Sequence, residues 1–121
     1  MMRSTAVRLL SSSSKAAAMH AIADICVVPL GVGVSVGEQV ALVCKYLKDL
    51  PNLETKTHAY GTNISGELDE VLAAVAGCHK FLHKQHNVPR ISTTLKIGTR
   101  IDKAQTMEDK LESVRRRNGK L

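Results

Sequence analysis

The stretch LETKTHAYGTNIS, from Leu53 to Ser65, decides the fold that this sequence predicts. Its first nine residues alternate, with small or β-branched side chains such as Thr55 and Thr57 on one side and charged or polar ones on the other. A period of two is typical of a strand, and the short β-prone run after Gly61 has the same character. The stretch therefore predicts a β-hairpin.

A helix is predicted on each side of this hairpin. Ser35-x-x-Glu38 has the spacing of a capping box, in which a serine and a glutamate satisfy free N–H groups at the start of a helix. Apolar residues then recur at helical spacing until Pro51-Asn52, which is expected to end the helix. Residues 66–86 carry acidic side chains at their start, where the helix dipole favours them, and a second apolar stripe.

Two further strands are predicted outside these helices. The run AIADICVVPLG, residues 21–31, is apolar at almost every position except Asp24, so both of its faces are expected to be mostly covered. Residues 88–98 alternate between apolar and polar side chains, and this strand is expected to break at Gly98. Beyond it, Thr106-x-x-Asp109 resembles a second capping box and predicts a last helix that ends near Asn118.

The predicted order is β-α-β-β-α-β plus a C-terminal helix. This is the α+β, ferredoxin-like arrangement, in which two helices pack on one face of a four-stranded antiparallel sheet. A chain of 121 residues suits a single domain, which we place at residues 20–118. The other face of the sheet is partly apolar in this arrangement. It suggests sheet-to-sheet packing between subunits, with polar side chains left to line a cavity.

Charge and composition exclude several classes of protein. The net charge of +6 lies mainly at the two ends of the chain, whereas residues 19–114 carry nearly equal numbers of basic and acidic residues. No basic nucleic-acid-binding patch is visible, and the strands hold a single aromatic residue, Tyr60, where RNA recognition by a similar sheet uses several. No apolar run approaches the length of a membrane span. We therefore expect neither a nucleic-acid nor a membrane partner.

The three cysteines, Cys26, Cys44 and Cys78, all lie in apolar runs. Their number is odd and no C-x-x-C pair occurs, which argues against a disulfide framework or a cysteine-based zinc site. A reducing compartment is the natural expectation.

Residues 1–19 differ from the rest of the chain. They contain arginine, serine and alanine but no acidic residue, which is the composition of mitochondrial transit peptides. The alternative is a disordered extension without a targeting role. These two readings correspond to a mitochondrial or a cytoplasmic location.

Several short motifs resemble one known family, the small thiamine-binding proteins of ferredoxin-like fold. The matching pieces run from about Asp24 to Val114, and GTRIDK (98–103) followed by QTMEDK (105–110) is the most specific. The others are Pro29-Leu30-Gly31 with Ser35, Gly61-Thr62, Gly66 with the acidic run after it, His79 and Arg90. The chain departs from the family pattern at Val32, where threonine is common, and at Ser65, where glutamate is usual.

This resemblance implies an oligomer and a ligand. Members of the family form dimers that pair into tetramers, some bind thiamine or its pyrimidine part, and no catalytic reaction is established for them. The resemblance therefore implies a homotetramer, a dimer of dimers, with self as the partner and thiamine as a possible ligand rather than a cofactor.

Four residues are candidates for the ligand site. Thiamine needs hydrogen-bonding groups for its aminopyrimidine and a carboxylate or π-face near its cationic ring. Thr62, Asn63 and Ser65 on the hairpin fit the first need, and Asp24 fits the second. The structural alternative is that Asp24 pairs with Lys96 or Arg90 across the sheet, because buried carboxylates are costly unless paired. Asn63 and Ser65 are also ordinary turn residues.

Other groups of residues give weaker evidence of function. His79, His83 and His86 share one helix face, but one helix cannot close a tetrahedral shell, so we predict no metal site and hydrogen-bonded histidines instead. Cys26 and His79 are the only trace of a catalytic pair. We expect subunit contacts at Phe81, which lies off its helix stripe, and at three charged residues that follow the last strand: Arg100, Asp102 and Lys103.

The sequence as a whole favours a non-catalytic, oligomeric protein that binds thiamine or its pyrimidine part. The alternatives are a structural oligomer without a ligand and an enzyme of unknown type.

Overall fold

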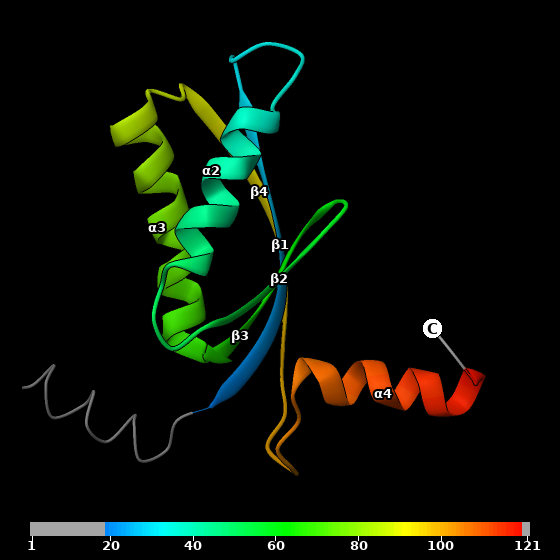
Figure 1. The fold of residues 1–121 in the computed structure, drawn as a ribbon. Coiled ribbons are helices and arrows are strands. Elements are labelled where there is room, and N and C mark those ends of the chain that lie inside the picture. The colour runs from blue at the N-terminus through cyan, green and yellow to red at the C-terminus, as the bar shows by residue number, and fades with distance from the viewer. Residues whose placement is uncertain (1–18, 120–121) are drawn as a thin grey trace, which may run out of the picture.

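The structure, a computed structural model, describes residues 19–119 of the chain. The elements follow the predicted order, and Figure 1 shows their arrangement in space. They are β1 (His20–Leu30), α2 (Gly37–Lys48), β2 (Glu54–His58), β3 (Gly61–Glu67), α3 (Leu68–His86), β4 (Arg90–Thr99) and α4 (Met107–Asn118). The extension expected at residues 1–19 lies, apart from Met19, outside the described residues.

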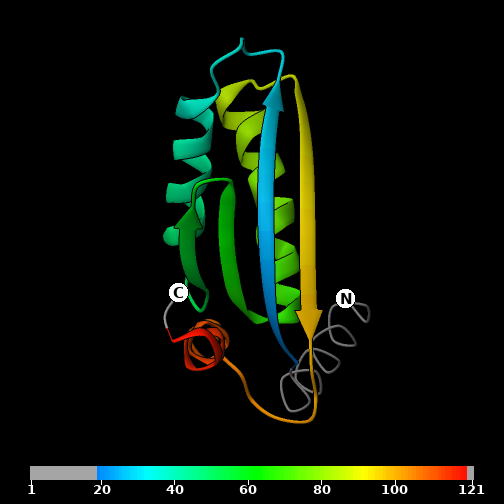
Figure 2. The same ribbon diagram turned by 90° about the vertical axis from the view of Figure 1, so that its right-hand side faces the viewer.

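The four strands form one antiparallel sheet in the order β2-β3-β1-β4. The two outermost strands of the sequence thus lie side by side, and the predicted hairpin adds β3 and then β2 to the other edge of β1 (Figure 2). β1 pairs with β4 from Ala21 to Leu30 but with β3 only as far as Ile25, which lies opposite Thr62. This is the ferredoxin-like fold that the hairpin predicts.

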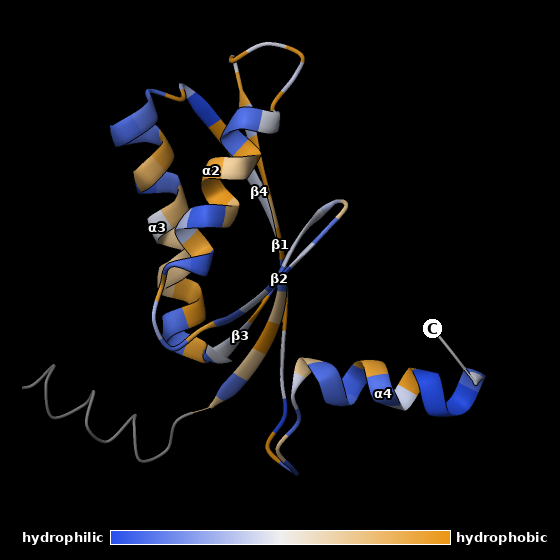
Figure 3. Cartoon of the chain, viewed as in Figure 1, coloured by the Kyte–Doolittle hydropathy of each residue, from blue (hydrophilic) through white to orange (hydrophobic). Residues whose placement is uncertain are grey.

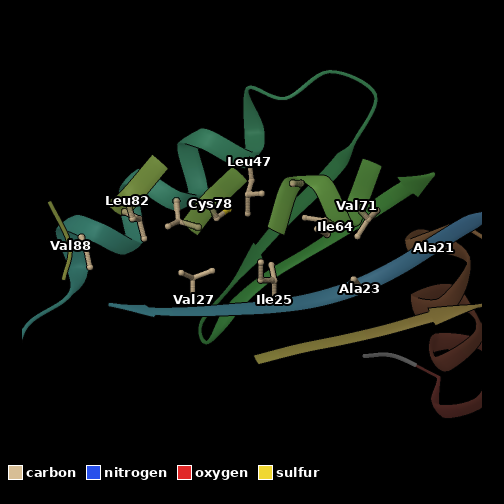
Figure 4. Packing of buried hydrophobic residues seen from close by; sticks show 12 residues of the cluster. Ala21, Ala23, Ile25, Val27, Leu47, Ile64, Val71, Cys78, Leu82 and Val88 are labelled. Atoms are coloured by element: carbon tan, nitrogen blue, oxygen red, sulfur yellow. The ribbon is translucent and has the colours of Figure 1, made fainter. Parts of the chain in front are cut away.

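Helices α2 and α3 cover one face of the sheet and enclose the core (Figures 1 and 4). Alternate residues of β1 point into it, because side chains of a strand alternate between its faces. The chain has few aromatic residues, so aliphatic side chains, alanine and Cys78 fill this layer. The main contributors are Ala23, Ile25, Val27, Leu47, Ile64, Val71, Cys78 and Leu82.

The other face of the sheet is left to α4 and to solvent. Of the described helices, α4 alone lies on this side, and its surface is largely hydrophilic (Figures 1 and 3). Met107, at its start, is buried but does not belong to the main core. β1 is therefore buried on one face and only half-buried or exposed on the other, whereas the sequence predicted that both faces would be mostly covered.

Of the two predicted capping boxes, one is present in the structure and the other is not. At α4 the box is confirmed, since Asp109 N donates to Thr106 Oγ1 at 3.0 Å and Thr106 N donates to Asp109 Oδ2 at 2.9 Å. At α2 the prediction is wrong, because Val36 is the N-cap and no side chain bonds the free N–H groups. Gly31 and Gly33, both with positive φ, direct the loop that precedes this helix.

The end of β4 also differs from the prediction. The strand continues through Gly98, which pairs with Ile22, to Thr99. Gly98 has no positive φ, and a side chain built there meets no other atom within 4 Å. Among the described helices, none is long and apolar enough to span a membrane.

Candidate functional site

The candidate site lies on the sheet face away from α2 and α3. Directly opposite residues of neighbouring strands share a face, so Asp24 of β1 stands between Asn63 of β3 and Lys96 of β4. His58 belongs to the same face through the pairing of β2 with β3. Strand alternation thus places one carboxylate, one amide, one imidazole and two amines on this face, since Lys56 of β2 also lies opposite Asn63.

Asp24 is held by two of these neighbours. Its Oδ1 lies 2.5 Å from His58 Nε2 and accepts a hydrogen bond from Asn63 Nδ2 at 3.3 Å. The backbone N–H of Tyr60 donates to His58 Nδ1 at 3.2 Å, so Nδ1 is an acceptor and the ring donates to Asp24 through Nε2. His58 thus links Asp24 of β1 to the turn after β2.

This arrangement corrects the predicted partner of Asp24. The sequence favoured an ion pair with Lys96 or Arg90. Lys96 is its direct cross-strand neighbour, yet within residues 19–119 no ion pair shorter than 4.0 Å joins the two, and Arg90 lies opposite Leu30 at the far end of β4. Asp24 does have a partner across the sheet, but it is His58 of β2 and not a basic residue of β4.

A cavity of about 460 Å³ adjoins Asp24 and Asn63. Its floor is the surface of β1 and β4, with Ile22 and Gly98 beside each other. Its other lining residues include Ala104, Gln105 and Lys110, from the turn after β4 and the start of α4. Figure 2 shows this turn passing below the sheet, and Figure 1 shows α4 projecting away from the sheet on the face opposite α2 and α3. The volume suits a small organic molecule.

The turn after β4 is fixed by Arg100. Its Nε donates to Asp102 Oδ1 at 2.7 Å, a second guanidinium nitrogen donates to Asp102 Oδ2, and Nη1 donates to Gln105 Oε1 at 3.2 Å. The hydrogen bonds from Arg100 lower the pKa of Asp102 from 3.8 to about 2. Arg100 and Lys103 also line the cavity, so the segment that was expected to form a subunit contact is part of the cavity wall.

The candidate ligand residues are divided between the two faces. Asp24 and Asn63 line the cavity. Ser65 shares their face, opposite Ile22, but is buried and does not line it. Thr62 points the other way: it is buried toward the helices, where its Oγ1 lies 3.8 Å from Cys44 Sγ. The structure thus brings two of the four together at the cavity.

Phe81 is half-buried within the chain. Its ring stacks on Tyr46, with centroids 4.9 Å apart, and meets the edge of His86. These contacts cover part of the ring within one chain, and the expected subunit contact at Phe81 stays a prediction.

Two of the three histidines of α3 have hydrogen-bond partners. His79 Nε2 lies 2.7 Å from Thr93 Oγ1, and His83 Nδ1 lies 2.7 Å from the carbonyl oxygen of Val88. In the described part of the chain, no group of three potential ligands could hold a metal ion. Cys26 shares the open face with Asp24, whereas His79 bonds Thr93 on the helix-covered face, so the sheet separates this pair.

Sequence reasoning missed three residues of the site. His58 was placed on one side of its strand but not connected to Asp24, because only the register of β2, β3 and β1 brings the two together. Gln105 and Lys110 belong to the QTMEDK motif, but their place at the cavity depends on the path of the turn that joins β4 to α4.

Comparison with known proteins identifies the family of the chain. A family model described as thiamine-binding protein matches residues 23–115. A UPF0045 protein of Synechocystis sp. is 53% identical over 97 residues, which cover 80% of this chain and 78% of the relative. A UPF0045 protein of Eremothecium gossypii is 37% identical over 100 residues, covering 82% of this chain and 93% of that protein.

Solved structures share the fold. The crystal structure of a hypothetical protein from Methanocaldococcus jannaschii aligns with a TM-score of 0.72 at 34% identity, covering 84% of this chain and 98% of that one. A putative thiamine biosynthesis/salvage protein of Thermotoga maritima aligns with a TM-score of 0.67 at 19% identity, covering 79% and 99%, and shows the fold alone. The family match and the relatives over most of the chain show that this protein belongs to the thiamine-binding protein family.

Proposed function

We propose that this chain is a non-catalytic, oligomeric protein that binds thiamine or its aminopyrimidine part in the cavity beside Asp24. The cavity itself carries the proposal, because it joins a small-molecule volume to a carboxylate and an amide that face the same space. The family to which the chain belongs supports the choice of ligand.

The chemistry of the two side chains fits an aminopyrimidine. Such a ring presents an amino donor next to a ring-nitrogen acceptor. The carboxylate of Asp24 accepts hydrogen bonds, and the amide of Asn63 both donates and accepts them. His58 and Asn63 already bond one oxygen of Asp24, which holds the carboxylate in place for a ligand. Ile22 provides an apolar surface for the flat ring.

Gly98 provides the sharpest test of this proposal. It lies on the cavity floor, its φ suits any residue, and a Cβ there meets nothing within 4 Å. We expect Gly98→Leu to fill the cavity without disturbing the fold. Gly37→Leu is the matched control, because Gly37 also has open space around it but lies at the start of α2, outside the cavity.

The measurement is isothermal titration of both variants and the parent with thiamine and with the aminopyrimidine alcohol. Binding to the parent and to Gly37→Leu, with loss in Gly98→Leu, is the expected result. Equal binding by all three proteins would place the ligand elsewhere. No heat for the parent at millimolar ligand would contradict the function.

A structural oligomer is the second candidate. Val28 and Leu30 on the open face of β1 are each 38% exposed, and this half of the face lies beyond the part that β3 pairs. Apolar side chains on an uncovered sheet face favour packing against another surface. A second copy of this chain is the occupant that the family resemblance implies.

A further inference from the structure

We propose that the ligand of this cavity carries a phosphate ester, so that the site binds the phosphorylated form of the aminopyrimidine or of thiamine in preference to the free alcohol. This inference rests on the proposed function and extends it to the charge of the ligand. It follows from the basic side chains on the cavity wall, which the recognition of a pyrimidine does not use.

The cavity is strongly asymmetric in charge. Asp24 is the single acidic residue among those that line it, whereas four basic residues do: Lys96, Arg100, Lys103 and Lys110. Elsewhere the described body has nearly balanced charges, so the excess is local. A pocket lined mainly by one sign of charge attracts a ligand, or part of a ligand, of the opposite sign.

The three lysines have no competing ion pair. Arg100 is occupied by Asp102 and Gln105, but within residues 19–119 none of Lys96, Lys103 and Lys110 forms an ion pair shorter than 4.0 Å. The ammonium of Lys103 contributes to lowering the pKa of both Asp102 and Asp109, but these carboxylates are already hydrogen-bonded by Arg100 and by Thr106, respectively. The ammonium groups therefore remain available to an anion.

Two of the basic groups lie apart from the sheet. Asp24, Asn63, Ile22 and Lys96 lie on the sheet. Lys103 lies in the turn after β4, and Lys110 lies on α4. A ligand with its aminopyrimidine on the sheet has Lys96 beside the ring and would meet Lys103 and Lys110 with its other end.

The charge of free thiamine also favours a phosphorylated ligand. Its thiazolium ring is cationic, and only one carboxylate lines the cavity against four basic groups. Adding a phosphate to the hydroxyl end turns the unfavourable approach of a cation into a pairing of phosphate with ammonium. A phosphate on the pyrimidine alcohol would be held in the same way.

The test compares each alcohol with its phosphate monoester by isothermal titration. In the parent protein we expect the ester to bind roughly tenfold more tightly or better, since charged hydrogen bonds are among the stronger ones. This advantage should shrink as salt rises, because the lysines are exposed to solvent.

Two double variants isolate the lysines. Lys103→Gln with Lys110→Gln should bring the affinity for the ester to that for the alcohol measured in the same variant, because the two ammonium groups that would pair with the phosphate are removed. Lys80→Gln with Lys84→Gln is the control, because it removes the same charge from exposed positions of α3, on the other side of the sheet. Equal melting temperatures verify that all variants fold.

The outcomes separate the two proposals. If the alcohol binds and the ester binds no better, or if the advantage of the ester survives in Lys103→Gln/Lys110→Gln, the phosphate inference is overturned and the proposed function stands. If neither compound binds to the parent, both fail. Loss of the advantage in the cavity variant alone supports the inference.

Discussion

Asp102 carries the clearest electrostatic signature of any single residue in the turn after β4. Hydrogen bonds from Arg100 lower its pKa from 3.8 to about 2. A depressed pKa favours the folded state above the ordinary value, and that contribution is lost as pH falls from about 4 to about 2. We expect Arg100→Ala to return the pKa of Asp102 toward 3.8, as measured by NMR titration of its carboxyl carbon. An unchanged titration would show that the pair does not form in solution.

Cys78 gives a second prediction at this scale. Burial, and to a lesser degree the neighbouring Cys44, raises the pKa of its thiol from 9.0 to about 12. The thiol therefore stays protonated and unreactive at pH 8, because the thiolate is the nucleophile. We expect iodoacetamide to modify the half-buried Cys26 in the native protein and Cys78 only after unfolding, as followed by peptide mass spectrometry. Equal rates for the two in the native state would contradict the buried position of Cys78.

The same shift has a consequence for stability. The raised pKa favours the folded state below pH 9.0, and the advantage is lost as pH rises from there toward about 12. Cys78→Ala removes this ionisation but also removes the packing of the side chain. If the ionisation has the larger effect on stability, the variant should begin to unfold at a higher pH than the parent.

At the scale of the element, the starts of α4 and α2 can be compared through one substitution in each. Thr106→Ala removes a side-chain cap and should destabilise α4 by about 1 kcal/mol. Ser35→Ala should leave α2 unaffected, because Ser35 makes no cap bond there. Hydrogen exchange of the amides in each helix measures both effects, and faster exchange in α2 of Ser35→Ala would show that a cap forms in solution.

These two starts also show what the sequence could predict. The hairpin, the two covering helices and the alternation of β4 follow from local periodicity, and all of them are present. The box at Ser35 fails because the pattern says nothing about the path of a loop, which Gly31 and Gly33 set here. Asp24 was found because a carboxylate on an apolar strand is unusual, and Asn63 because polar residues of the hairpin could bond an aminopyrimidine. His58 joins them only through strand register and Lys110 only through the path of the turn after β4, which are tertiary features.

At the scale of the whole molecule, the open half of the sheet leads to a prediction about assembly. We expect the parent chain to sediment as an oligomer and Val28→Glu with Leu30→Glu to reduce it to a monomer, because charges on this face would be buried without partners. Val34→Glu is the control, since Val34 is fully exposed in the loop before α2. A monomeric parent would contradict the proposed oligomer.

Arg100→Ala tests the expected subunit contact at the turn after β4. If this turn lies in an interface, the variant should loosen the oligomer. If the oligomer keeps its size and stability while ligand affinity falls, Arg100 serves the cavity wall instead.

The attachment of α4 sets how a bound molecule would enter and leave. This helix is joined to β4 by residues 100–106, and its clearest tie to the sheet is the exposed ion pair of Glu108 with Lys56, at 3.4 Å. Exposed pairs of this kind contribute little. A molecule that contacts both the sheet and Lys110 would hold α4 in place. The rate at which that molecule is released would then depend on how fast α4 moves. Limited trypsin digestion at Arg115, Arg116 and Arg117 would then slow on loading, which makes the C-terminal helix a built-in reporter of occupancy.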